Sequence, residues 1–158
     1  MSRVSDRLAS LGIVIPEVSA PAGAYIPAIS SGSLVFTAGQ LPFVDGALPA
    51  TGKVGTGSGS GFVSPEDAKG YARLAAINAL AAVESVLGSL DRVTRVVKVV
   101  GFVASDPSFT GQPGVINGAS ELLGEVFGEQ GVHARSAVGV AVLPLDSPVE
   151  VELIVEFE

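Results

Sequence analysis

Cysteine is absent from this chain, and histidine occurs only once among its 158 residues. Without cysteine the chain can form no disulfide, thiolate nucleophile or cysteine-ligated metal site. A single histidine is too few for a histidine-rich metal centre. The sequence therefore predicts no metal site, and any chemistry must come from other side chains.

Basic residues are also scarce, since nine lysines and arginines stand against sixteen acidic residues, for a formal net charge of −7. This is the wrong sign for a protein whose affinity comes from neutralising phosphates, so we expect no nucleic-acid partner. Long unbroken apolar runs are missing, so we expect no membrane span or membrane partner. Residues 1–11 carry Arg3, Asp6 and Arg7 in place of the apolar stretch of a secretory signal, which predicts a cytoplasmic location.

Apolar residues are plentiful: they make up 47% of the chain, whereas charged residues make up 16%. A chain of this length usually folds as one unit, and we expect a single domain over residues 1–158 with an N-terminal extension at 1–20. So small a domain cannot bury all of its apolar surface. We therefore also expect a homo-oligomer.

Hydrophobic periodicity and turn residues predict an α+β fold. The best-defined element is a helix that Ser64 caps, with Pro65 at its first position and Gly88 at its end. A second helix is expected at 115–127, ending at Gly128. Strands are expected at 28–31, 34–37, 92–104, 133–144 and 149–157. This order favours a mixed sheet with two helices packed on one face.

Two other segments are less regular. Ser5 is a candidate cap for a short N-terminal helix whose apolar side holds Leu8 and Leu11. Residues 45–61 contain six glycines and little apolar content, which predicts a mobile surface loop that serves either as a lid or as a connector. This loop lacks the Lys-Ser/Thr ending of a phosphate-binding loop and the strand-to-helix setting of a dinucleotide fingerprint.

Arg135 is the main candidate for chemistry. Because side chains alternate along a strand, it shares a face with Ala137, Gly139 and Ala141, and that face is nearly bare. A guanidinium over a bare surface can hold a ligand carboxylate or phosphate through two parallel hydrogen bonds. The other interpretation is an ordinary surface salt bridge.

The last strand carries a row of carboxylates on one face, namely Glu150, Glu152, Glu156 and Glu158. Such a row is typical of a solvated sheet face. If Val142 pairs with Val149 in a hairpin, Glu150 lies ~20 Å along the sheet from Arg135. Side chains that far apart serve one site only if that site forms between subunits.

Three other residues give weaker signals. His133 precedes Arg135 by two positions, and with no Ser or Asp arrangement around it we interpret it as a loop residue. Tyr25 lies in a proline-broken segment and is interpreted as a packing or capping residue. Asn117 lies near the start of the second helix, where it is a candidate helix cap.

Several motifs together resemble those of the YjgF/RidA family, the reactive-intermediate deaminases that also carry the label L-PSP endoribonuclease-like. The C-terminal signature is the most extensive, with ARSAV at 134–138, LP at 143–144 and VEVE at 149–152. FTAGQLP at 36–42 is similar to a strand-end motif of the family, and residues 21–25 are similar to its lead-in, which ends in tyrosine. The resemblance covers residues 20–158, and the N-terminal extension and the longer loop indicate an outlying branch.

The resemblance implies a chorismate-mutase-like subunit that assembles as a homotrimer with ligand clefts between subunits. In the family an arginine binds the substrate carboxylate and a glutamate positions water; Arg135 and Glu150 match these two residues. Tyr25, Asn117 and the backbone of Gly39 match further substrate contacts. The implied reaction is hydrolysis of small enamine or imine intermediates, of the 2-aminoacrylate type, to a 2-keto acid and ammonia without a cofactor.

The chain departs from the family pattern at Ala38, where deaminases often carry serine, and at Ala137, where a cysteine is usual. Gly23-Ala24-Tyr25 also stands in place of Gly-Pro-Tyr. Two alternative hypotheses therefore remain: a non-catalytic module that binds a small carboxylic acid such as a 2-keto acid, and an RNA endonuclease, which the net charge disfavours.

Overall fold

The computed structural model describes residues 3–57 and 59–158. The helices and strands follow in the order α1 (Val4–Ser10), β1 (Ala28–Ser31), β2 (Leu34–Thr37), β3 (Lys53–Val54), β4 (Phe62–Val63), α2 (Pro65–Leu87), β5 (Val93–Ala104), α3 (Gln112–Phe127), β6 (Ala134–Val140) and β7 (Val149–Phe157). Each predicted helix and strand is present. The second long helix begins three residues earlier than expected, and β6 is shorter at both ends.

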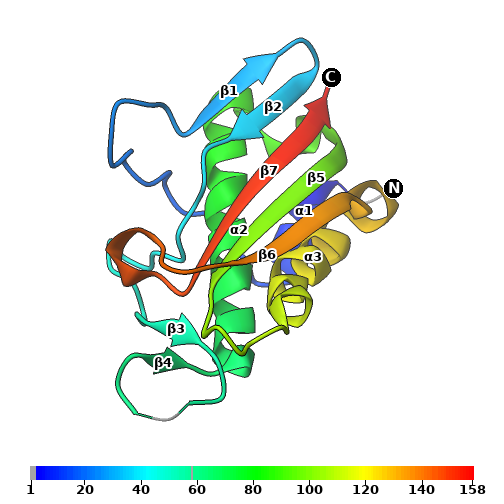
Figure 1. Cartoon of the computed structure of the whole chain (residues 1–158). Helices are drawn as coiled ribbons and strands as arrows, with labels where there is room; N and C mark the ends of the chain where they lie inside the picture. The colour runs from blue at the N-terminus through cyan, green and yellow to red at the C-terminus, as the bar shows by residue number, and fades with distance from the viewer. Residues whose placement is uncertain (1–2, 58) are drawn as a thin grey trace.

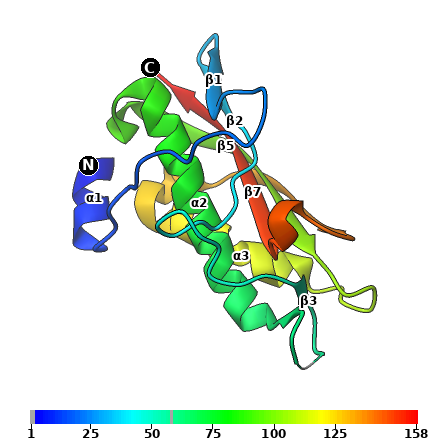
Figure 2. The ribbon, with the colours of Figure 1, turned by 90° about the vertical axis from the view of Figure 1, so that its left-hand side faces the viewer.

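Five strands form one mixed sheet in the order β1-β2-β7-β5-β6. β5 and β6 run parallel, whereas the other neighbouring pairs are antiparallel. Helices α2 and α3 lie side by side against one face of this sheet, as Figures 1 and 2 show from two directions. The predicted α+β arrangement, a mixed sheet with two long helices on one face, is confirmed.

The predicted hairpin between the last two strands is wrong. β5 lies between β6 and β7, parallel to the former and antiparallel to the latter. Helix α3 carries the chain back along the sheet, so β6 starts at the same end as β5 and pairs with it in parallel. The short segment that follows, with a 3₁₀ turn at Pro144–Asp146, then crosses the end of β5 to reach β7. The short loop between β6 and β7 predicted that these two strands pair, but β5 separates them.

The boundaries of α2 follow from its sequence. The hydroxyl of Ser64 accepts a hydrogen bond from the backbone N–H of Asp67 at 3.1 Å, and Pro65 occupies the first turn. Gly88, with φ of 78°, ends the helix in the left-handed conformation that glycine adopts without strain. The alanines on the inner side of α2 are fully buried: Ala68, Ala72, Ala75, Ala76 and Ala79.

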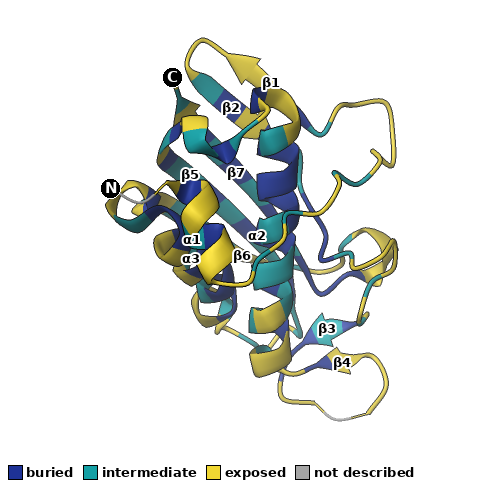
Figure 3. Cartoon of the chain, turned by 180° about the vertical axis from the view of Figure 1, so that it is seen from behind, coloured by how far each residue is buried: buried dark blue, intermediate teal, exposed yellow. Residues whose placement is uncertain are grey.

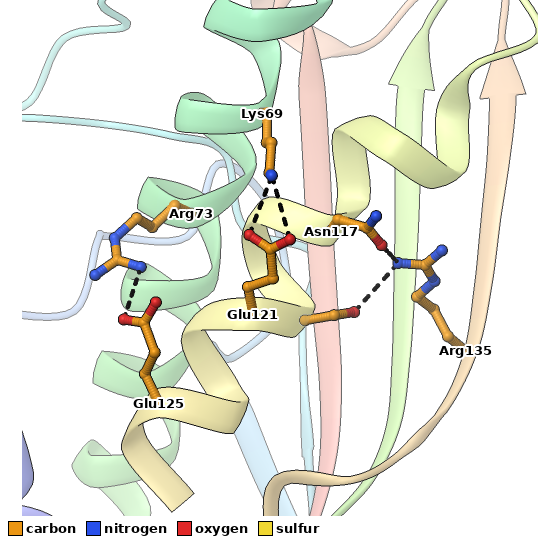
Figure 4. A network of polar contacts seen from close by, with 7 residues as sticks. Lys69, Arg73, Asn117, Glu121, Glu125 and Arg135 are labelled. Atoms are coloured by element: carbon orange, nitrogen blue, oxygen red, sulfur yellow. Dashed lines mark hydrogen bonds and ion pairs between the residues drawn. The ribbon is translucent and has the colours of Figure 1, made fainter. Parts of the chain in front are cut away.

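Helix α3 packs closely on α2. A Cβ atom at Gly118 would overlap the backbone carbonyl of Lys69, so only glycine permits this approach. Two ion pairs then link the exposed sides of the helices: Lys69 with Glu121 at 3.1 Å and Arg73 with Glu125 at 3.2 Å (Figure 4). Exposed pairs of this kind contribute only about 0–1 kcal/mol each, so apolar burial is the main cohesive force.

The core lies between the helices and the sheet. Figure 3, viewed from the helix side, shows buried residues along α2 and in the strands behind it. The largest fully buried side chains are Phe127, Leu80, Ile116, Leu122, Leu123 and Leu153. The described part of the chain contains no helix long and apolar enough to cross a bilayer.

The N-terminal extension packs onto this domain. Val4 and Leu8 of α1 are buried, and Arg3 forms an ion pair with Asp91 at 2.6 Å. The prediction that Ser5 caps this helix is wrong, because Ser5 lies inside α1 and its backbone N–H donates to Asp91 instead. This hydrogen bond is the main reason why the pKa of Asp91 lies below its ordinary value.

The glycine-rich segment at 45–61 includes parts of the small β3–β4 ladder. Lys53 pairs with Phe62, Val54 pairs with Val63, and the side chain of Val54 is fully buried. The Lys53 ammonium also donates to the backbone carbonyl of Ala141 at 2.6 Å. The segment is therefore attached to the domain near Val54, which favours the connector interpretation for that part.

Candidate functional site

Arg135 lies on the edge strand β6, on the sheet face that carries the helices. Its Nη1 donates to Oδ1 of Asn117 at 2.7 Å and to the hydroxyl of Ser120 at 3.3 Å, and both acceptors belong to α3 (Figure 4). No carboxylate of the described residues forms an ion pair with Arg135, so the surface salt-bridge interpretation is not what the structure shows. The guanidinium is therefore held by neutral groups, and no carboxylate of the described residues competes with an anionic ligand for it.

Asn117 is not the helix cap that its position suggested. Helix α3 begins at Gln112 after Gly111, so Asn117 lies well inside the helix. Its side chain instead accepts the hydrogen bond from Arg135. The structure thus brings together two of the predicted site residues, Arg135 and Asn117, on the same side of the sheet.

His133 lies just before β6 and outside the strand, as its interpretation as a loop residue implied. The expectation that no serine is arranged around it is wrong. Its Nε2 lies 2.9 Å from the hydroxyl of Ser120, and its Nδ1 lies 2.6 Å from the carbonyl oxygen of Gly131. Sequence reasoning missed Ser120 because it lies thirteen positions before His133, with the end of a helix and a 3₁₀ turn between them. The one available signal was the spacing of three from Asn117 to Ser120, which places both on one side of a helix.

The other three predicted residues lie in a second group. Tyr25, Gly39 and Glu150 line one pocket with a volume of about 430 Å³, together with Leu41, Phe43 and Leu145. This volume suits a small-molecule ligand. The Tyr25 hydroxyl accepts a hydrogen bond from the backbone N–H of Ala22 at 3.2 Å, so Tyr25 caps its own turn while it lines the pocket.

Glu150 lies directly against the backbone of Gly39. A Cβ atom at Gly39 would stand 2.6 Å from Oε1 of Glu150, closer than such atoms approach, so glycine is what allows the contact. Gln40 fixes this backbone, because its N–H donates to the Val151 carbonyl at 2.8 Å and its own carbonyl accepts from the Val151 N–H at 3.0 Å. The segment after β2 and the start of β7 therefore fix the position of the Glu150 carboxylate together.

The carboxyl of Glu150 is electrostatically unusual. Burial raises its pKa above the ordinary value, and the neighbouring charge of Glu152 raises it further. Burial also raises the pKa of Glu152. The first part of the predicted carboxylate row is therefore half-buried rather than solvated, whereas Glu156 is exposed. A carboxyl with a raised pKa can accept and return a proton closer to neutral pH.

The two groups of residues do not meet within one chain. Arg135 pairs with Val99 on the helix face, whereas Glu150 pairs with Phe102, three positions further along β5 and therefore on the opposite face. The offset of two strands and three residues separates their backbones by ~14 Å. Arg135 and Glu150 therefore face opposite sides of one sheet.

A larger cavity, of about 670 Å³, adjoins the Glu150 pocket between the N-terminal extension and α2. Pro16, Phe43 and Asn78 line it, and none of the predicted site residues does. Within residues 3–57 and 59–158 there is no cluster of acidic or histidine side chains that would hold a metal ion.

Comparison with known proteins gives one family over most of the chain. A family model described as "YjgF/chorismate_mutase-like, putative endoribonuclease" matches residues 5–157. Among curated proteins, Protein TCP17 of Trypanosoma cruzi is 44% identical over 155 residues, which cover 98% of this chain and 94% of that protein.

Several solved structures are similar to this chain in sequence and fold. The Agrobacterium tumefaciens protein Atu1372, described as of unknown function, is 43% identical with a TM-score of 0.87, and the match covers 98% of this chain and 92% of that one. A "putative endoribonuclease" from Shewanella oneidensis is 33% identical with a TM-score of 0.92, over 99% and 100% of the two chains. Escherichia coli TdcF, solved with bound serine, is 27% identical with a TM-score of 0.63, over 90% and 94%.

Proposed function

The chain belongs to the YjgF/RidA family, and from this premise we propose that it hydrolyses small enamine or imine intermediates to a 2-keto acid and ammonia. The observation that carries the proposal is the division of the family-matched residues into two complementary groups. Arg135 and Asn117 form one group, and Tyr25, Gly39 and Glu150 form the other. One group offers a cation for a carboxylate, and the other offers a pocket with a carboxyl of raised pKa.

In the proposed reaction Arg135 holds the substrate carboxylate. Its Nη1 is bound to Asn117 and Ser120, which orients the guanidinium and leaves its other N–H groups for two parallel hydrogen bonds to the ligand. Binding of this kind places the imine carbon in one position and removes much of the entropic barrier to attack by water. The serine seen in TdcF is a small amino acid with a carboxylate, which is consistent with this ligand class.

Glu150 supplies the acid–base step. The imine reacts in its N-protonated form: the Glu150 carboxylate accepts a proton from the attacking water as the water oxygen bonds to the imine carbon, which gives a neutral carbinolamine. The carboxyl then returns this proton to nitrogen, and the C–N bond breaks as the carbinolamine hydroxyl becomes the carbonyl and releases its own proton, so the products are the 2-keto acid and ammonium. The raised pKa of Glu150 suits both halves of this exchange. No cofactor takes part, because an imine is already electrophilic.

The site forms between subunits in this proposal, in a homotrimer of the chain. The two groups lie on opposite faces of one sheet, so Arg135 of one subunit meets Glu150 of its neighbour. Apolar side chains on the sheet face opposite the helices support assembly: Ile29, Phe36 and Val138 are 56%, 38% and 45% exposed. Surface of this kind is typical of a subunit interface.

A non-catalytic carboxylic-acid binding module is the second candidate, because Ala38 supplies no hydroxyl beside the Glu150 pocket. An RNA endonuclease is disfavoured by the net charge of −7. Absence of binding to single-stranded RNA at low salt would remove the endonuclease hypothesis.

The test is ammonia and 2-keto acid release from imines generated in situ by an amino-acid oxidase or dehydratase. Wild type should accelerate release above the spontaneous rate, and Arg135→Ala and Glu150→Gln should not. No acceleration with several imines, from an intact oligomer, would contradict the enzymatic proposal. Binding of 2-ketobutyrate without turnover would then favour the binding module.

A further inference from the structure

We propose that Ser120 is a nucleophilic serine, activated by His133, and that the chain reacts with small acyl esters through it. The inference rests on contacts within a single subunit and requires neither Glu150 nor imine hydrolysis, although it shares Arg135 and Ser120 with the proposed imine site. Ser120 on α3 and His133 just before β6 lie within hydrogen-bonding distance, 2.9 Å between Oγ and Nε2. That is the separation of a nucleophile from its general base.

The carbonyl oxygen of Gly131 fixes the tautomer of His133. A carbonyl can only accept a hydrogen bond, so in the neutral ring Nδ1, at 2.6 Å from it, carries the proton. Nε2 is then the unprotonated nitrogen, and it accepts the hydrogen bond from the Ser120 hydroxyl. This is the arrangement in which an imidazole removes a proton from serine.

The orienting carbonyl is itself held in place. Gly131 is buried, and a Cβ atom there would overlap the backbone carbonyl of Leu123 on α3. Only glycine allows this contact, so the turn before His133 is packed against the same helix that carries Ser120. The base and the nucleophile are therefore positioned by one helix and the turn that follows it.

One donor lies beside the serine hydroxyl. Nη1 of Arg135 is 3.3 Å from Ser120 Oγ, so its guanidinium faces the region where an oxyanion would develop. Asn117 lies three residues before Ser120 on the same helix face, and its Oδ1 accepts from Arg135.

The reaction balances without any further reagent. The Ser120 oxygen bonds to the acyl carbon while its proton moves to Nε2 of His133, and the carbonyl electron pair moves to oxygen. Collapse of this intermediate breaks the ester bond, and the leaving alkoxide takes the proton from Nε2. Water repeats the two steps, which releases the carboxylic acid and regenerates Ser120.

Labelling with a fluorophosphonate, followed by intact mass and peptide mapping, tests the proposal directly. We expect one adduct, located on Ser120, which Ser120→Ala abolishes and His133→Ala slows at least tenfold. Ser136→Ala is the matched control, because Ser136 lies one residue from Arg135 on the other side of β6. No adduct on Ser120, or equal labelling in His133→Ala, would overturn the proposal.

A single-cysteine experiment tests His133 without relying on the native serine. The chain has no cysteine, so Ser120→Cys and the control Ser136→Cys each introduce one thiol. Alkylation by iodoacetamide at pH 6.5 should be at least tenfold faster at position 120, because a neighbouring imidazole lowers a thiol pKa from about 8.5. Adding His133→Ala should remove the difference. Equal rates at the two positions would overturn the proposal.

Discussion

Arg135 and Glu150 lie on opposite faces of the same sheet, with β5 between their strands. Arg135 is level with buried Val99, on the side of α3, and Glu150 is level with Phe102, on the other side. Neither side chain can reach the other without passing through the sheet. A reaction that uses both therefore needs two copies of the chain.

Loss of Arg135 should weaken carboxylate binding. A hydrogen bond to a charged group contributes about 1.5–3 kcal/mol, so Arg135→Ala should raise the Kd for 2-ketobutyrate about 10- to 100-fold. Titration calorimetry measures this. Arg95→Ala, an exposed arginine on β5, is the control and should leave the Kd unchanged. Equal affinity of Arg135→Ala and wild type would exclude the anchor role.

Gly39→Ala should displace Glu150. The added methyl group would stand 2.6 Å from Oε1 of Glu150, so the carboxylate has to move away from the pocket. We expect at least a tenfold loss of imine hydrolysis with little change in fold. The comparison is Gly70→Ala in α2, where no atom lies within 4 Å; this variant should gain about 0.5–1 kcal/mol of stability and keep its activity. Full activity in Gly39→Ala would refute the geometric requirement.

The pH dependence of stability should report the buried carboxyl of Glu150. Burial raises its pKa in the folded protein, so the folded state binds the proton more tightly than the unfolded chain. The tighter proton binding stabilises the folded protein. This stabilisation is fully present below the ordinary glutamate pKa of 4.5 and is lost as the pH rises through the pKa of Glu150 in the folded protein.

Glu150→Gln, which removes the titration, should therefore raise Tm at pH 7.5 and have little effect at pH 4. Thermal melts at the two pH values measure this difference. Glu156→Gln, on the same strand but exposed, is the control. A Tm for Glu150→Gln at pH 7.5 at or below that of wild type would show that the ionised Glu150 carboxylate does not destabilise the folded protein.

Local signals predicted the parts of this fold that local chemistry determines. Ser64 and Gly88 cap α2 as expected, because a capping hydroxyl and a left-handed glycine act on their nearest neighbours. The β6–β7 hairpin was wrong because strand neighbours depend on how α3 returns the chain, which a six-residue loop does not encode.

For the candidate site too, the sequence predicted individual residues but not which of them lie together. Arg135 was singled out from the strand pattern and Glu150 from the family resemblance, but their positions on opposite faces depend on β5 lying between their strands. Ser120 and His133 were not paired in advance, since the contact exists only once α3 and β6 pack together. Tertiary neighbours of this kind leave no periodic trace in the sequence.

The measurement that tests the account most directly is complementation between two inactive variants. Arg135→Ala and Glu150→Gln subunits are mixed one to one, refolded together, and assayed for imine hydrolysis. If each site takes its arginine and its glutamate from different subunits, about one site in four combines two intact halves, so about a quarter of wild-type activity should return. Activity no higher than that of the separate variants, in oligomers shown to be mixed, would contradict a site shared between subunits.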